Sequence, residues 1–278
     1  MFGVLNGYIS SPDALAAIDT QFLVQFVDFV LVFLRHHYHR VCIASGQGDT
    51  QFPMASFVSL LVKLTCSDKI DTDVFEMCLE VWSFFLEEYS DISSEVAAGS
   101  ESSSATIQTA TQARKQMCPL LLGAFKQLAP VVLRRIFFQF NLAQLSGLDD
   151  APSENVEPKV SGVKNGDVGL GAQSELDNFT AKVTKLVSKF AQLSELGDVL
   201  LSVIGPQLKT ALDNFRNRSK LNPADVKRVL HDVSTVLGLL CSASAHFLHQ
   251  FERYFATAAP VLSVLLDLAQ FCTVRHLL

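Results

Sequence analysis

The chain lacks an excess of positive charge and lacks the common catalytic motifs, and both absences exclude classes of protein. Of its 278 residues, 22 are Lys or Arg and 28 are Asp or Glu, which gives a formal net charge of −6. Nucleic-acid binding needs a basic face that neutralises phosphates, which this composition does not favour. No segment matches G-x-G-x-x-G, the P-loop, H-E-x-x-H or G-x-S-x-G. We therefore predict no catalytic residues and no cofactor, and no residue pattern identifies a partner-binding site.

The six cysteines include no C-x-x-C pair, which weakens the case for zinc or redox chemistry. Each lies among apolar residues with helical spacing, so we predict buried, reduced thiols in an intracellular protein. The N-terminus shows no basic segment followed by an apolar one, so a signal peptide is not expected. The cysteines are Cys42, Cys66, Cys78, Cys118, Cys241 and Cys272.

The apolar segments are interrupted by charged residues or histidine. In "QFVDFVLVFLRHHYHRV" (25–41) only six residues separate Asp28 from Arg35, and other segments are interrupted by His231 and Asp232 and by Asp267. A membrane-spanning helix needs about twenty apolar residues, and an Asp near the bilayer centre costs about 2.5–3.5 kcal/mol. We therefore expect a soluble chain with no membrane insertion.

Apolar residues instead recur at helical spacing along most of the chain, while no segment alternates with period two. Asn222 and Pro223 in "LNPADVKRVL" have the form of an N-cap followed by a proline in the first helical turn. The sequence therefore predicts an all-α fold. The expected helices cover residues 19–42, 53–66, 73–89, 114–144, 174–194, 197–216, 223–249 and 257–276.

Two stretches interrupt this pattern. Residues 90–113 are rich in Ser and Thr, and residues 145–173 are rich in Gly, Pro and acidic residues. Neither has enough apolar content to offset the entropy of ordering, so we expect flexible inserts. Because apolar residues recur at the same helical spacing on both sides of each insert, we predict one repeat segment, 1–278. Residues 1–18 form an uncertain N-terminal extension of it. The helices then form about four antiparallel pairs, as in an α-solenoid of the HEAT type, with a compact bundle as the alternative.

A helical wheel of residues 25–41 argues against a metal site at the three histidines. His36 and His39 share a polar stripe with Gln25, whereas His37 points about 100° or more away from both. At most two of them could bind one ion, and zinc takes three or four protein ligands. We predict no metal, and we interpret Arg35, His36, His39 and Arg40 as cations that complement the helix dipole in its last turns. The rest of the wheel, including Phe22 and Phe29, is predicted to be buried.

Other candidate groups also have plain structural interpretations. Glu87 and Glu88 are expected at a solvated helix end rather than as paired catalytic carboxylates. Pro119, Pro130 and Pro206 are expected to start or kink helices.

Several segments together resemble the middle region of nuclear export receptors (exportins) in the importin-β (karyopherin) superfamily. They occur in the same order over about residues 20–270, and "LEVWSFFLEEY" (79–89) is the strongest local match. The segments are "FVDFVLVFLRHHYHRV" (26–41), "FVSLLVKLT" (57–65), "FEMCLEVWSFFLEEY" (75–89), "LRRIFFQFNLAQLSGLDD" (133–150) and "RVLHDVSTVLGLLCSASAHFL" (228–248).

The resemblance implies a HEAT-repeat transport receptor rather than an enzyme. It implies cargo binding with Ran-GTP in the nucleus, passage along nucleoporins, release in the cytoplasm, and shuttling between the two compartments. Profilin–actin is the implied cargo. The chain is far shorter than such receptors and does not match their Ran-binding N-terminal repeats, so we expect a fragment, a truncated gene model or a divergent protein. The alternatives are a HEAT-type interaction scaffold unrelated to transport and, as a remainder, a helical enzyme.

Overall fold

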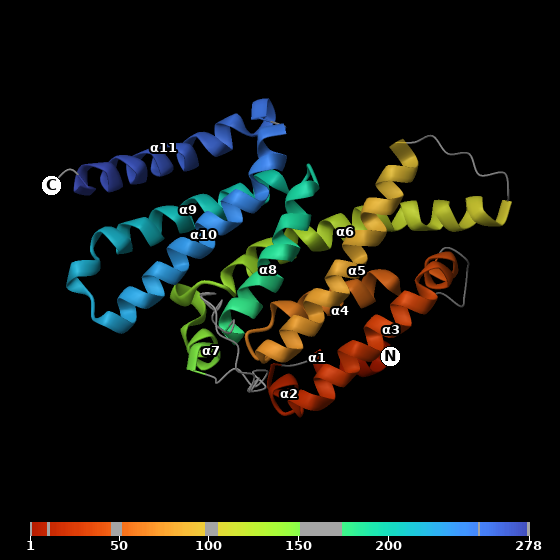
Figure 1. Cartoon of the computed structure of the whole chain (residues 1–278). Helices are drawn as coiled ribbons and strands as arrows, with labels where there is room; N and C mark the ends of the chain where they lie inside the picture. The colour runs from red at the N-terminus through yellow and green to blue at the C-terminus, as the bar shows by residue number, and fades with distance from the viewer. Residues whose placement is uncertain are drawn as a thin grey trace, which may run out of the picture. The chain divides into compact units, whose positions relative to one another are not determined.

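The computed structural model describes residues 2–9, 12–45, 52–97, 105–150, 174–249 and 251–276. These residues form eleven α-helices and one short 3-10 helix, with no strand among them (Figure 1). The α-helices are α1 (Phe2–Ile9), α2 (Pro12–Ala16), α3 (Thr20–Ser45), α4 (Met54–Cys66), α5 (Thr72–Ala97), α6 (Ala105–Arg134), α7 (Phe138–Asp150), α8 (Glu175–Gln192), α9 (Gly197–Arg216), α10 (Pro223–His249) and α11 (Phe251–His276).

The predicted all-α fold class is confirmed, and the packing of helix on helix agrees with an α-solenoid. Helices α9 and α10 have the predicted bounds. The start of α10 is fixed as expected, because the Asn222 side chain accepts a hydrogen bond from the Asp225 N–H at 2.8 Å. Pro223 is the first residue of α10, where its missing N–H costs nothing.

Several helices are longer than the sequence predicts. Helix α5 continues to Ala97 and α6 begins at Ala105, so helix occupies both ends of the segment predicted as the first insert. The serines are accommodated because Ser93 and Ser94 donate to the carbonyls of Tyr89 and Asp91, one turn earlier. Helix α7 runs to residue 150, inside the second predicted insert. Residues 98–104 and 151–173 lie outside the described residues, so flexible inserts stay a prediction.

The single helix predicted over 114–144 is wrong, because the chain turns at residues 135–137 between α6 and α7. No Gly or Pro marks this turn. Its free backbone groups are bound by side chains instead: Asp232 accepts from the Phe138 N–H at 2.8 Å, and Asn141 donates to the Arg135 carbonyl at 3.0 Å. Pro119 and Pro130 lie within α6 rather than at a helix start.

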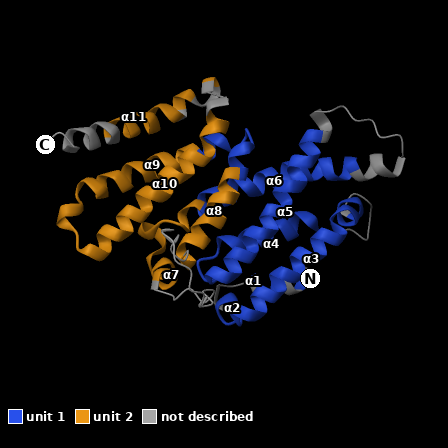
Figure 2. Cartoon of the chain, viewed as in Figure 1, with its two compact units in different colours: residues 1–132, 189–200 blue, residues 133–188, 201–278 orange. Residues whose placement is uncertain are grey.

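The chain divides into two compact units, shown in Figure 2: residues 1–132 with 189–200, and residues 133–188 with 201–278. This division shows where contacts concentrate, and the predicted single repeat segment stays a prediction.

The first unit has an aromatic core centred on the only tryptophan. The Trp82 ring packs against Phe85 and Phe125, with ring centroids 5.5 and 6.3 Å away, and Phe125 packs against Phe190 at 5.6 Å. The Trp82 indole N–H donates to the Thr65 hydroxyl at 2.8 Å, which satisfies a fully buried polar group. The core therefore joins helices α4, α5, α6 and α8.

The second unit buries one face of α8, α9 and α10. Phe179 and Val183 on α8 and Leu208 on α9 are at most 2% exposed. Helix α9 approaches α11 closely at Gly205, where an added Cβ would lie 3.2 Å from the Val261 side chain.

One stretch of α6, residues 111–134, is long and apolar enough to cross a membrane by length and composition. Its inner face, including Leu121, Phe125 and Leu128, is buried in the protein with 0% exposure. A core helix of a helical protein passes the same composition test, and Phe125 of this stretch packs against Trp82.

Candidate interaction surface

Helix α3 presents an exposed row of large apolar side chains. Phe22, Phe29 and Val32 are 41%, 57% and 44% exposed. They alternate with polar positions at spacings of three and four residues, so all lie along one face of the helix. We define the α3 stripe as Phe22, Gln25, Phe29, Val32, His36 and His39, all of which are exposed.

The prediction that Phe22 and Phe29 are buried is therefore wrong. On the helical wheel both lie within about 60° of Gln25, just outside the edge of the polar sector that His36 marks. Sequence reasoning assigned them to the buried face because they are hydrophobic. Their position beside the polar sector does not by itself show that they are exposed, because hydrophobic residues there can be buried or exposed.

The C-terminal half of the stripe is basic. Arg35, His36, His39 and Arg40 are all exposed, whereas His37 is partly buried with its ring 5.2 Å from that of Phe33. Helix α3 continues to Ser45, so these cations do not lie in its last turn. Because the helix-dipole effect falls off within one turn, the predicted role in complementing the dipole is wrong.

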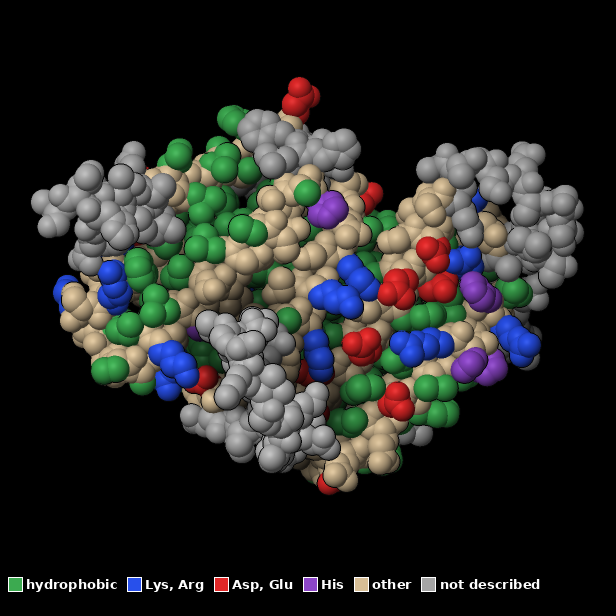
Figure 3. All heavy atoms as spheres, in the orientation of Figure 1, with side chains coloured by type: hydrophobic (Ala, Val, Ile, Leu, Met, Phe, Trp, Pro, Cys, Tyr) green, Lys and Arg blue, Asp and Glu red, His purple; other side chains and the backbone are tan. Residues whose placement is uncertain are grey.

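The N-terminal half of the stripe lies beside acidic groups. Asp28 is exposed on α3 itself. A cavity of about 440 Å³ opens next to Gln25 and is also lined by Asp73 and Glu76 of α5. Over α3, Figure 3 shows hydrophobic side chains beside acidic ones, with histidine and basic side chains toward the C-terminal end. The surface therefore has acidic groups beside its N-terminal half, around Gln25, and basic groups along its C-terminal half.

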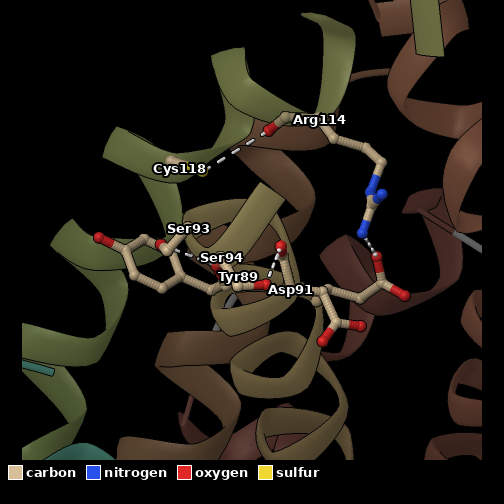
Figure 4. Close-up of polar contacts among 7 residues, drawn as sticks. Tyr89, Asp91, Ser93, Ser94, Arg114 and Cys118 are labelled. Atoms are coloured by element: carbon tan, nitrogen blue, oxygen red, sulfur yellow. Dashed lines mark hydrogen bonds and ion pairs between the residues drawn. The ribbon is translucent and has the colours of Figure 1, made fainter. Parts of the chain in front are cut away.

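Helix α5 uses its two adjacent glutamates to bind other helices. Glu88 accepts from the Arg114 guanidinium of α6 at 3.0 Å, and both side chains are largely buried (Figure 4). Glu87 accepts from the Lys189 ammonium of α8 at 2.8 Å in a more exposed pair. The predicted solvated helix end is wrong, because α5 extends about two further turns to Ala97.

The cysteine prediction is confirmed in part. Cys42 and Cys78 are buried, Cys66 and Cys118 are half-buried, and Cys241 is exposed on α10. These five cysteines form no disulfide, and the side chain of Cys272 lies outside the described residues. Burial raises the pKa of the Cys42 thiol to about 11 and also raises the pKa of the neighbouring Tyr38. Burial raises the pKa of Cys118 as well. Thiols held in the protonated form are poor nucleophiles, so Cys42 and Cys118 are not suited to catalysis.

A second cavity, of about 540 Å³, lies within the second unit between α7, α8 and α10. The Ser146 Oγ and the His231 Nδ1 are buried there without a hydrogen-bond partner. Asp149 pairs with Lys227 at 2.6 Å, and the remaining lining charges also include both signs. This balance favours neither an anion nor a cation.

Among the described residues, no three His, Cys, Asp or Glu side chains lie close enough together to hold a metal ion. The α3 stripe, with three exposed large apolar side chains, is therefore the candidate interaction surface.

Comparison with known proteins finds relatives of one kind. Over 266 residues, 92% of the chain, it is 23% identical to exportin-6 of Dictyostelium discoideum. Over 141 residues, 51% of the chain, it is 28% identical to exportin-6-B of Xenopus laevis. The chain is similar to exportin-6. Over 136 residues, 49% of the chain, it is 29% identical to human exportin-6.

These relatives are much longer than the chain, which spans 22% of the Dictyostelium exportin-6 and 10% of the human exportin-6. No protein-family model matches the chain, and no solved structure does. The relatives are exportins, which are transport receptors and not enzymes.

Proposed function

We propose that the chain is a central HEAT-repeat part of a nuclear export receptor that resembles exportin-6. The observation that carries the proposal is the similarity to the Dictyostelium exportin-6 over 92% of the chain. It is supported by shorter matches to exportin-6 of vertebrates. An all-α fold of packed helices, with no strand among the described residues, is what such a receptor requires.

In this proposal the receptor carries protein cargo out of the nucleus together with Ran-GTP. Profilin–actin is the proposed cargo, nucleoporins are the proposed partners during passage, and the receptor shuttles between nucleus and cytoplasm. The net charge of −6 fits protein partners better than nucleic acid. The alternative is a HEAT-type interaction scaffold unrelated to transport, which the fold would also serve.

Depletion of the protein in its source organism tests the proposal. We expect actin to accumulate in the nucleus and to return to the cytoplasm when the protein is restored. As a control, a reporter carrying a leucine-rich export signal should be unaffected, because another receptor would carry it. Unchanged nuclear actin after full depletion would refute the proposed cargo, and unimpaired export of every tested protein would favour the scaffold.

A further inference from the structure

We propose that the end of the second unit where α9 meets α10 binds an acidic segment of a partner protein. We define the basic tip as residues 209–228, which are the last turns of α9, the 3-10 helix Arg218–Lys220 and the first turns of α10. This inference goes beyond the proposed transport role and does not rest on it.

The basic tip is opposite in charge to the rest of the chain. It contains six of the 22 Lys and Arg residues but only two of the 28 Asp and Glu residues, so its net charge is +4 and that of the remaining residues is −10. In Figure 3, Lys and Arg side chains lie over the end where α9 and α10 meet. A cluster of one sign attracts a partner of the opposite sign and fixes how it docks. The six cations are Lys209, Arg216, Arg218, Lys220, Lys227 and Arg228.

Half of these cations are not neutralised by acids of the described residues. Lys209 and Lys220 are exposed and Arg218 is half-buried, and none of the three forms an ion pair within the part of the chain that the structure describes. A carboxylate of a partner therefore gains attraction at these three side chains without first displacing an acid of this chain. The other three cations form the pairs Arg216–Asp213 at 3.6 Å, Lys227–Asp149 at 2.6 Å and Arg228–Asp225 at 2.8 Å.

Arg218 is held in a fixed position that suits a carboxylate. Its Nη1 donates to the Phe215 carbonyl at 2.8 Å, and its guanidinium carbon lies 4.0 Å from the centre of the Phe215 ring. A guanidinium carries five N–H donors in a planar fork, and this fork matches the two oxygens of a carboxylate. Because the side chain is already ordered, binding costs less conformational entropy there than at a free arginine.

The charge distribution favours a short acidic protein segment over nucleic acid or an anionic membrane. Both of these are extended, so they would also approach the residues that carry a net charge of −10. Base stacking needs an exposed aromatic face, whereas Phe215, the only aromatic residue of the tip, is half-buried beneath Arg218. A short segment stays within about 8 Å of the tip, the screening length at physiological salt, and avoids this repulsion.

Two peptides test the proposal on the full chain, residues 1–278. The first is a fluorescent peptide of about twelve residues, in which about six Glu residues alternate with Gly and Ser. The second has Gln in place of every Glu and is the matched control. We expect the acidic peptide to bind at least about tenfold more tightly in fluorescence anisotropy at about 50 mM salt, and to bind less tightly as the salt concentration rises.

Variants of the chain then locate the site. R218E/K220E should weaken binding of the acidic peptide at least about tenfold, whereas R35E/R40E, which changes the net charge equally on α3, should alter it by less than about twofold. Arg218→Lys keeps the charge but removes the planar fork, so we expect a loss of about threefold. Lys220→Glu changes only an exposed side chain, and its expected loss of about threefold tests the site even if the Arg218 variants fold poorly.

Four results would overturn the proposal. The first is no binding of the acidic peptide at low salt by a chain with native helical circular dichroism. The second is an equal effect of R35E/R40E and R218E/K220E, which would show attraction to net charge alone. The third is tighter binding of a single-stranded oligonucleotide of about twelve nucleotides, or of vesicles of phosphatidylserine and phosphatidylcholine, that R218E/K220E abolishes. The fourth is a dimer at low salt that R218E/K220E abolishes, which would show that acidic residues of a second copy of this chain occupy the tip.

Discussion

The carboxylate of Asp232 accepts a hydrogen bond from the backbone N–H of Phe138 at 2.8 Å, although 94 residues separate them in the chain. Phe138 is the first residue of α7, where helix geometry leaves the N–H without an internal partner. The neighbouring His231 ring packs edge-on against the Phe138 ring at 5.0 Å. Two adjacent residues of α10 therefore fix the point at which α7 begins.

Asp232→Ala should lower the free energy of unfolding by about 1–3 kcal/mol, because it leaves a buried backbone N–H without an acceptor. Asp232→Asn should lose less, since the amide oxygen still accepts. Guanidinium unfolding followed by helical circular dichroism measures both. Asp267→Ala, at an exposed position on α11, is the matched control and should change stability by less than about 0.5 kcal/mol. Equal effects at Asp232 and Asp267 would contradict the capping role.

The same contact shows why part of the fold could not be predicted. Apolar periodicity was enough for α9 and α10, where the pattern is regular and Asn222 and Pro223 mark a start. The turn between α6 and α7 has no local signal, because the group that stabilises it, Asp232, comes from a distant helix. Tertiary contacts of this kind override the local pattern.

The candidate surface was predicted only in part, for a related reason. The wheel placed Gln25, His36 and His39 on one exposed face, and the structure agrees. It could not show that Phe22 and Phe29 remain exposed, because burial depends on whether another element covers them. Hydrophobicity alone does not decide that question.

The single tryptophan supplies a second prediction. The Thr65 hydroxyl accepts from the Trp82 indole N–H and donates to the Leu61 carbonyl, both at 2.8 Å, and Thr65 is fully buried. Thr65→Val keeps the volume but leaves the indole N–H unsatisfied, so we expect a loss of about 1–3 kcal/mol in the free energy of unfolding. Thr65→Ser retains the hydroxyl and should lose less. An equal free energy of unfolding for the Thr65→Val variant and the parent chain would show that this hydrogen bond does not contribute to stability.

Adjacent glutamates on α5 should differ in their effects. Glu88→Gln weakens a largely buried pair with Arg114, and we expect a loss of about 1.5–3 kcal/mol in the free energy of unfolding. Glu87→Gln weakens an exposed pair with Lys189, which is screened by solvent, so the loss should be below about 1 kcal/mol. Raising the salt concentration should reduce the Glu87 effect more than the Glu88 effect. Comparable losses at both positions would contradict the difference in burial.

Stability should fall at alkaline pH, in part because of Cys42. Burial raises the pKa of this thiol to about 11 in the folded state, against an ordinary value of 9.0 that we take for the unfolded chain. The folded state therefore binds the thiol proton more tightly than the unfolded chain does. The contribution of Cys42 to the free energy of unfolding is complete below the unfolded pKa and is lost as pH rises toward 11. The loss attributable to Cys42 is about 2–3 kcal/mol over that range.

Unfolding free energies measured from pH 8 to pH 11 test this account. Cys42→Ala should make the decline with pH shallower, while the burial of Tyr38 and Cys118 leaves part of it in place. Cys241→Ala, at an exposed position, should leave the slope as in the parent chain. A slope that Cys42→Ala does not change would show that this thiol ionises equally in both states.

The proposed transport role is tested most directly by the nucleotide dependence of cargo binding. The protein is immobilised, together with any sequence that extends beyond residues 1–278 in its source organism, and the binding of profilin–actin is measured with Ran-GTP and with Ran-GDP. A nuclear export receptor should bind the cargo at least about tenfold more tightly with Ran-GTP, because cargo and Ran-GTP bind cooperatively. Cargo binding that is equal with Ran-GTP and Ran-GDP would contradict the export role and favour the interaction scaffold.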